Sequence, residues 1–176
     1  MHATESEDLR FPVGRHTPVD RFDRRVVDEG IAAIEAFPGR LRALLAGTDE
    51  ASLEKTYRPK GWTARQVVHH LADSHTHIYI RFKWTLTEDT PTIKAYDEAG
   101  WAELPDYRGP VEPALRMLEA IHARWTALMR TMDDVAFQKR FHHPETGGYM
   151  TLFDRVACYA WHGRHHLAHI RLALEG

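Results

Sequence analysis

Apolar residues recur every three or four positions along four separate stretches of this chain, and this period restricts what the chain can fold into. In the last stretch the recurring residues are Leu152, Val156, Tyr159, Gly163, Leu167, Ile170 and Leu174. Such spacing places side chains on one face of an α-helix, whereas a strand would alternate at every second residue. Each helix has to bury its apolar stripe against other helices.

The other three stretches are also predicted to be amphipathic helices. The second has the clearest start, because Thr63 followed by Gln66 three residues later matches a capping box. Asp89-Thr90-Pro91 ends that helix, and Thr151 is expected to cap the last one. Four such helices with no convincing strand pair predict an all-α fold, a four-helix bundle.

The segments between the helices give further expectations. Pro38 should kink or restart the first helix. Residues 92–109 form a connection longer than a usual structureless loop, which indicates functional shaping or a short helix. The turn-rich residues 142–148 favour an insert such as a small hairpin. We expect an extended N-terminal arm over 1–18 and a single helical-bundle domain over 19–176, a length that fits one domain.

Composition excludes several classes of protein. The formal net charge of −2 argues against a nucleic-acid partner, since there is no overall basic field. No apolar run approaches the roughly 18 residues of a membrane span, and the polar N-terminus does not resemble a signal peptide. Cys158 is the only cysteine, so an internal disulfide is impossible. A cytoplasmic location is the default expectation.

Histidine is unusually frequent, with 13 residues. Four lie between His69 and His77 and four between His162 and His169. Both clusters are interrupted by apolar residues at helical spacing, so neither is a tag. Two histidines four residues apart share a helix face and can reach one metal ion. Metal sites in bundles are built from such inward side chains on facing helices.

Direction separates the two histidine pairs of the last helix. At 100° per residue from the buried stripe, His166 lies about 60° away, His162 about 100° and His165 about 160°. His162 and His166 therefore flank the stripe, whereas His165 is expected to face solvent. The alternative is that His166 is a hydrogen-bonded core histidine and the others are surface residues.

The same reasoning is less decisive on the second helix. Measured from Leu71, His75 lies about 40° away, His70 about 100° and His69 about 160°. His69 is expected to be exposed. Geometry nominates either His70 or His75 as a third ligand and does not choose between them.

Several strings in order resemble one known family. Gly61-Trp62-Thr63 with Val67 to His75, Pro91 to Glu98, and Tyr159 to Ile170 are similar to the YfiT branch of the DinB superfamily. The resemblance covers nearly the whole chain after about residue 10. It implies a four-helix bundle, a homodimer, and a metal held by His70, His162 and His166. The choice of His70 over His75 rests on this resemblance.

Three neutral imidazoles suit zinc, nickel, copper or iron(II), and we expect one divalent ion per chain, zinc or nickel first. Three protein ligands leave an open coordination position, which is typical of catalytic sites. From the resemblance we expect a transferase that joins a small thiol such as bacillithiol to an electrophile through a metal-bound thiolate. The alternatives are a metal-dependent hydrolase that uses hydroxide and a non-catalytic metal-binding bundle.

Weaker candidates accompany the ligands. Asp73, Ser74 and His75 could orient a ligand through hydrogen bonds, although a structural role fits Asp73 better. Arg81 and Tyr159 could contact an anionic thiol, and both could equally be structural. Cys158 lies about 140° from the stripe and is not expected to be a nucleophile.

Overall fold

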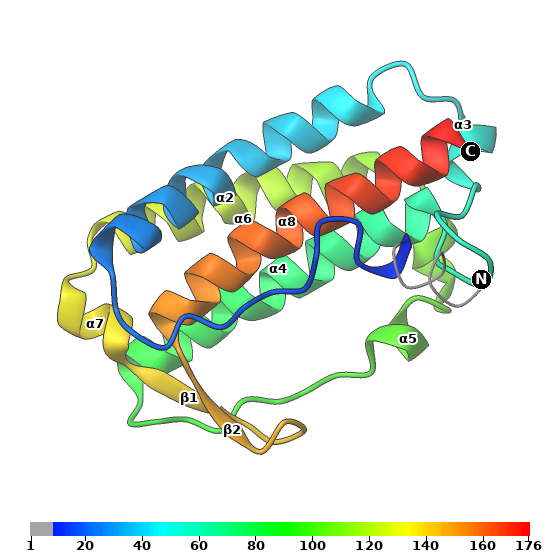
Figure 1. Ribbon diagram of the computed structural model, residues 1–176. Helices are drawn as coiled ribbons and strands as arrows, with labels where there is room; N and C mark the ends of the chain where they lie inside the picture. The colour runs from blue at the N-terminus through cyan, green and yellow to red at the C-terminus, as the bar shows by residue number, and fades with distance from the viewer. Residues whose placement is uncertain (1–8) are drawn as a thin grey trace.

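The computed structural model describes residues 9–176, and four long helices make up most of it (Figure 1). These helices are α2 (Arg24–Leu45), α4 (Ala64–Thr87), α6 (Glu112–Arg130) and α8 (Leu152–Glu175). The prediction of an all-α four-helix bundle is confirmed.

The helices do not pack in the order in which the chain forms them. Helix α2 packs against α6 and α8, and α4 packs against the same two helices. Helices α2 and α4 therefore lie across the bundle from each other, as do α6 and α8, whereas α4 and α6 are neighbours. Figure 1 shows that α2 and α8 run in one direction and that α4 and α6 run in the other. Because α4 and α6 are parallel, the chain has to cross the length of the bundle between them.

Short elements fill the connections. They are α3 (Glu50–Leu53), α5 (Glu98–Trp101), the 3-10 helix η1 (Pro105–Arg108), α7 (Asp134–Gln138), and strands β1 (Arg140–His143) and β2 (Gly148–Thr151). The crossing connection contains α5 and η1, as its length predicted. The two strands form the expected antiparallel hairpin, whereas α7 was not predicted.

Local signals in the sequence set the ends of the helices. Thr63 Oγ1 accepts from Gln66 N at 3.1 Å, and Gln66 Oε1 accepts from Thr63 N at 2.9 Å, so the capping box is formed. Thr151 caps α8 as predicted. Helix α2 runs unbroken through Pro38, so the prediction that this proline restarts the helix is wrong. The helix tolerates Pro38 because the Ile34 carbonyl, which loses its helical hydrogen-bond partner, is hydrogen-bonded to His122 of α6 instead.

The core has two apolar parts with a polar layer between them. One part lies around Phe82 and Trp125, and the other around Leu41 and Leu71. Helices α2 and α8 approach closely at Gly163, where an added Cβ would lie 2.8 Å from the Phe37 ring. The absence of a side chain there makes room for Phe37, which covers the buried histidines of the polar layer.

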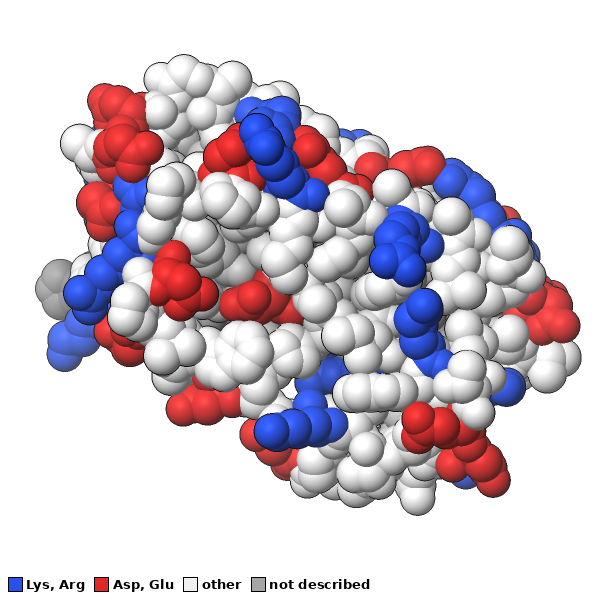
Figure 2. Space-filling model, turned by 180° about the vertical axis from the view of Figure 1, so that it is seen from behind, with Lys and Arg blue, Asp and Glu red and all other residues white. Residues whose placement is uncertain are grey.

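The described part of the N-terminal arm packs along α8 (Figure 1). Gly14 O accepts from Trp161 Nε1 at 3.0 Å, and Val19 N donates to Asp154 Oδ1 at 2.9 Å. Residues 1–8 of the predicted arm lie outside the described residues. Figure 2 shows acidic and basic side chains interspersed on the face seen there. None of the helices formed by residues 9–176 combines the length and apolarity that crossing a bilayer requires.

Candidate metal centre

The structure brings the three predicted ligands together. His70 comes from α4, whereas His162 and His166 come from α8, one turn apart. One ring nitrogen from each lies within 4.8 Å of those of the other two. His70 and His166 are buried, and His162 keeps part of its surface exposed. The two facing helices thus place three imidazoles around one point, as a metal site in a bundle requires.

A proline in α2 begins a chain of hydrogen bonds that ends at His162. Pro38 has no backbone N–H, so the carbonyl of Ile34 loses its usual helical partner four residues later. His122 Nδ1 lies 2.6 Å from that oxygen. His122 Nε2 lies 2.7 Å from His75 Nδ1, and His75 Nε2 lies 3.1 Å from His162 Nδ1. Two buried rings therefore connect a backbone carbonyl to a predicted ligand.

The carbonyl determines which nitrogen of each ring carries the proton. Burial lowers the pKa of His122 to about 4 and holds the pKa values of His75 and His162 well below their ordinary value, so the rings are neutral at pH 7. A neutral imidazole has one donor and one acceptor nitrogen. Since a carbonyl only accepts, His122 Nδ1 donates to it, and His122 Nε2 accepts from His75. His75 Nε2 in turn accepts from His162 Nδ1, which leaves an unprotonated lone pair on His162 Nε2.

A second chain of hydrogen bonds reaches His166 from the N-terminal arm. The carbonyl oxygen of Arg10 lies 3.3 Å from His169 Nε2, and His169 Nδ1 lies 3.3 Å from His166 Nδ1. Burial lowers the pKa of His169 to about 4 and that of His166 well below its ordinary value, so both rings are neutral. By the same reasoning His169 donates to the carbonyl and accepts from His166 Nδ1. His166 Nε2 therefore also carries a lone pair.

These two lone pairs lie close together. His162 Nε2 and His166 Nε2 are 3.1 Å apart, and with both unprotonated no hydrogen bond joins them. Two acceptors at this distance repel each other unless one cation binds both. His70 Nδ1 is a buried ring nitrogen without a hydrogen-bond partner among residues 9–176. Two ligand nitrogens at 2.0–2.1 Å from a tetrahedral zinc would be roughly 3.4 Å apart, so the donor set fits a transition metal.

A second group of histidines also lies close enough together to bind one metal ion, namely His165, His166 and His169. The hydrogen bonds distinguish the two groups. His169 uses one nitrogen to donate to Arg10 O and the other to accept from His166, so it has no free lone pair for a metal. Tyr57 also stacks on the His169 ring at 3.9 Å. The arrangement therefore favours His70, His162 and His166 as the ligand set.

Two expectations about neighbouring histidines are wrong. His165 was expected to face solvent, yet only 7% of its surface is exposed. Trp161 stacks on its ring at 4.5 Å, and Phe11 from the N-terminal arm lies 5.9 Å away. His69 was expected to be exposed and is half-buried against Tyr107. In both cases a segment outside the four helices covers a helix face that periodicity assigns to solvent.

The weaker candidates have mostly structural partners. Asp73 Oδ2 accepts from Tyr107 Oη at 2.6 Å, which ties α4 to the crossing connection. Tyr159 Oη lies 3.2 Å from Ser74 Oγ, while its ring contacts both His75 and His162. Arg81 donates to Lys94 O at 3.2 Å. Burial raises the pKa of the Cys158 thiol, so it stays protonated and is a poor nucleophile.

Sequence reasoning missed His122 as part of the centre. The signal was present, because Leu118, His122, Trp125 and Met129 follow one another at intervals of four, three and four residues. His122 therefore belongs to the buried stripe of α6. The loop residues Tyr57 and Trp62, which stack on His169 and His70, were also missed, since periodicity does not place loops.

The hydrogen-bond chain through α6 predicts that His122→Leu weakens metal binding although residue 122 touches no ion. Without His122, the His75 ring loses the partner that fixes its tautomer, and His162 loses its orientation. We expect the metal dissociation constant to rise about 10- to 100-fold, the usual effect of losing a partner of a ligand. Competition with a chromogenic chelator measures this constant. The hairpin variant His142→Leu is the matched control, and equal affinities of the two variants would refute the role of the chain.

Comparison with known proteins gives consistent matches. The family model of the DinB superfamily matches residues 33–170. A Bacillus mycoides (strain KBAB4) protein named "putative metal-dependent hydrolase" is 46% identical over 164 residues, which cover 93% of this chain and 94% of that protein. The "putative metal-dependent hydrolase YfiT" of Bacillus subtilis (strain 168) is 43% identical over 167 residues, which cover 94% of this chain and 93% of YfiT.

A solved structure agrees with these matches. It is YfiT from Bacillus subtilis, described as "a probable metal-dependent hydrolase with an unusual four-helix bundle topology". Its superposition on this chain has a TM-score of 0.93 at 41% sequence identity and covers 96% of this chain and 97% of that one. The similarity therefore extends over the whole bundle and over the helices that carry the candidate ligands.

Proposed function

This chain belongs to the YfiT branch of the DinB superfamily, and on that premise we propose that it is a metal-dependent hydrolase whose ion is held by His70, His162 and His166. The observation that carries the proposal is that His162 Nε2 and His166 Nε2 lie close together and that each has an unprotonated lone pair. Two separate hydrogen-bond chains, each anchored on a backbone carbonyl, prepare these nitrogens to bind a cation. Relatives named as metal-dependent hydrolases support the same reading.

The protein's own residues would bind the ion and orient the rings that hold it. Burial keeps the imidazoles neutral, and the hydrogen bonds to His75 and His169 fix the ring planes of His162 and His166. Trp62 contacts the His70 ring, with ring centroids 4.8 Å apart, and covers one side of it. His70, His162 and His166 would hold the divalent ion, and the chemistry that it would supply there is the activation of water for hydrolysis.

Transfer of an external thiol remains the second candidate function. It follows from the family resemblance, and the centre's open coordination position would suit a thiol as well as water. Burial raises the pKa of the Cys158 thiol and makes it a poor nucleophile, so the thiol would be a separate molecule. The names of the relatives favour hydrolysis. Zinc or nickel as the ion, and a homodimer as the assembly, stay predictions.

One experiment separates these functions. Protein stripped by a chelator is reloaded with zinc, nickel, cobalt or iron(II), and cleavage of 4-nitrophenyl esters is followed by absorbance. We expect turnover that requires metal and no thiol. A parallel assay offers bacillithiol, coenzyme A, cysteine or glutathione together with a chromogenic electrophile. Metal-dependent conjugation without ester cleavage would replace hydrolysis by S-transfer, and tight metal binding without either activity would favour a non-catalytic bundle.

A further inference from the structure

A cavity of about 390 Å³ opens beside the candidate metal centre, within the size range of small-molecule sites. Its wall includes His166, a predicted ligand, together with His165 and His169. The remaining lining residues come from the N-terminal arm, the loop before α4 and the crossing connection: Arg10, Phe11, Tyr57, Arg58, Lys60, Gly61, Trp62 and Glu98. A molecule in this cavity would therefore touch the metal centre.

The loop 57–62 is fixed over the centre by two aromatic rings. Tyr57 stacks on His169 with ring centroids 3.9 Å apart, and Trp62 contacts His70 with centroids 4.8 Å apart. These contacts bracket the segment that carries Arg58 and Lys60. Arg58 and Lys60 are thereby held at the mouth of the cavity. The predicted ligand His70 lies on one side of them, and His169, the hydrogen-bond partner of His166, lies on the other.

The backbone of this loop is held in an unusual conformation beside the cavity. Lys60 adopts φ = +60°, a left-handed conformation that is costly for a residue other than glycine. At Gly61 an added Cβ would lie 2.8 Å from Arg58 Cγ and 3.1 Å from Arg58 O. A larger residue at 61 would push Arg58 away. Strain of this kind persists where the surroundings require one particular conformation, and it is common at binding sites.

Arg58 is the clearest sign of a missing partner. Its Nε atom is buried without a hydrogen-bond acceptor in the described part of the chain, and Nη1 reaches only the carbonyl of Pro59 at 3.2 Å. A buried guanidinium N–H without an acceptor is costly. Arg10, Arg58 and Lys60 face a single acidic residue of the lining, Glu98, so the cavity wall carries a positive excess.

We propose that this cavity binds the substrate and that the substrate carries an anionic group, a carboxylate or a phosphate, held by Arg58 and Lys60. The inference rests on the proposed hydrolase function and specifies its substrate class. The apolar part of the molecule lies against Phe11, Tyr57 and Trp62. For an ester, water supplies the hydroxyl group to the acyl carbon, the bond from that carbon to the alcohol oxygen breaks, and the alcohol leaves with the remaining proton.

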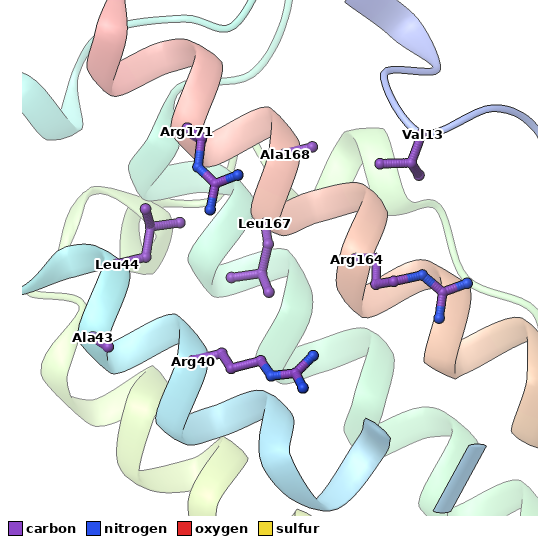
Figure 3. Close-up of a pocket in the computed structure, with 8 residues that line it drawn as sticks. All are labelled: Val13, Arg40, Ala43, Leu44, Arg164, Leu167, Ala168 and Arg171. Carbon is purple, nitrogen blue, oxygen red and sulfur yellow. The ribbon is translucent and has the colours of Figure 1, made fainter. Parts of the chain in front are cut away.

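A larger cavity of about 580 Å³ serves as a comparison. It lies between α2 and α8, and Figure 3 shows the guanidinium groups of Arg40, Arg164 and Arg171 spread around Leu167. None of its eight lining residues is a histidine. Because this cavity also contains arginines but does not reach the metal centre, Arg171→Gln is a matched control for removal of a positive charge.

The test combines direct binding with kinetics. Succinate and inorganic phosphate, titrated separately by calorimetry into metal-loaded and metal-free protein, measure anion binding and show which anionic group is preferred. Hydrolysis is compared for 4-nitrophenyl hemisuccinate, which is anionic, and 4-nitrophenyl acetate, which is neutral. We expect Arg58→Gln and Lys60→Gln each to weaken binding of the preferred anion about tenfold. Each should lower kcat/KM for the hemisuccinate by a similar factor and lower kcat/KM for the acetate much less. Arg171→Gln should leave kcat/KM for both esters unchanged.

The outcomes separate the inference from the function on which it rests. If both esters are cleaved equally well and neither loop variant changes binding or kcat/KM, the anionic substrate class is wrong while the hydrolase stands. If no ester is cleaved but anion binding still depends on Arg58 and Lys60, the anion site is supported and the hydrolase is wrong. Lys60 is exposed, so Lys60→Gln keeps the test valid even if Arg58→Gln disturbs the loop.

Discussion

Substitution of His162 or His166 by alanine is expected to reduce bound metal from one ion per chain to background. A zinc site with four ligands supplies about 10–16 kcal/mol of binding free energy, so one ligand accounts for roughly a 100- to 1000-fold change in affinity. His70→Ala should have the same effect, because its ring completes the group of three nitrogens. Metal analysis of untagged protein after dialysis measures the loss directly.

Neighbouring histidines provide the controls. His165→Ala and His69→Ala should retain the metal, since neither residue belongs to the favoured ligand set. His165→Ala does remove a buried ring that stacks on Trp161, so we expect it to lower the melting temperature without releasing the ion. An equal loss of metal in all five variants would show that the ligand assignment is wrong.

The fold could be predicted because the relevant signals are local. The capping box at Thr63 and Gln66 fixes the start of α4, and the stripe from Leu152 to Leu174 fixes the buried face of α8. The packing order could not be predicted. It depends on which helices contact each other across the bundle, and a period of 3.6 residues carries no information about the neighbour. The length of the segment 92–109 was the only hint that α4 and α6 run parallel.

The candidate metal centre could be predicted only in part, because periodicity does not show which groups contact each other across the bundle. Periodicity placed His75 on the inward face and His70 beside it, and it could not choose the ligand between them. In the structure the His70 ring lies among the candidate ligand nitrogens, whereas His75 contacts His162 from the far side. The exposure of His165 was misjudged since the N-terminal arm covers α8. Pro38 was read only as a disturbance of α2, whereas its missing N–H frees the Ile34 carbonyl that anchors the hydrogen-bond chain.

The same buried rings make the metal-free protein sensitive to acid. His70, His75 and His122 are each at most 3% exposed. Burial lowers the pKa values of His70 and His122 to about 4 and that of His75 well below its ordinary value. Between the unfolded value of about 6.5 and the lowered folded value, the unfolded chain binds protons that the folded chain does not. The stabilisation is therefore complete above pH 6.5 and is lost as the pH falls toward 4.

The expected size of this effect is large. A histidine with a folded pKa of about 4 contributes roughly 2.5 kcal/mol of stability at neutral pH that is absent at pH 4.5. His70 and His122 together contribute about 5 kcal/mol, and His75 adds to this in the same direction, so the loss reaches the range of the whole stability of a typical domain. Metal-free protein should therefore unfold between about pH 5 and 4.5, as measured by circular dichroism after dialysis. Bound metal should move the transition to lower pH, because it binds only the folded site.

A double variant tests the cause of this acid transition. In His75→Leu/His122→Leu both rings become apolar, and the hydrogen bond between them disappears with both of its partners. Ile34 O and His162 Nδ1 each lose one partner, so we expect some loss of stability already at pH 7. Removing the two groups should reduce the slope of the unfolding free energy against pH by about two protons between pH 6 and 5. His142→Leu, in the hairpin, should leave that slope as it is. A slope unchanged in the double variant would mean that acid unfolds the protein through other groups.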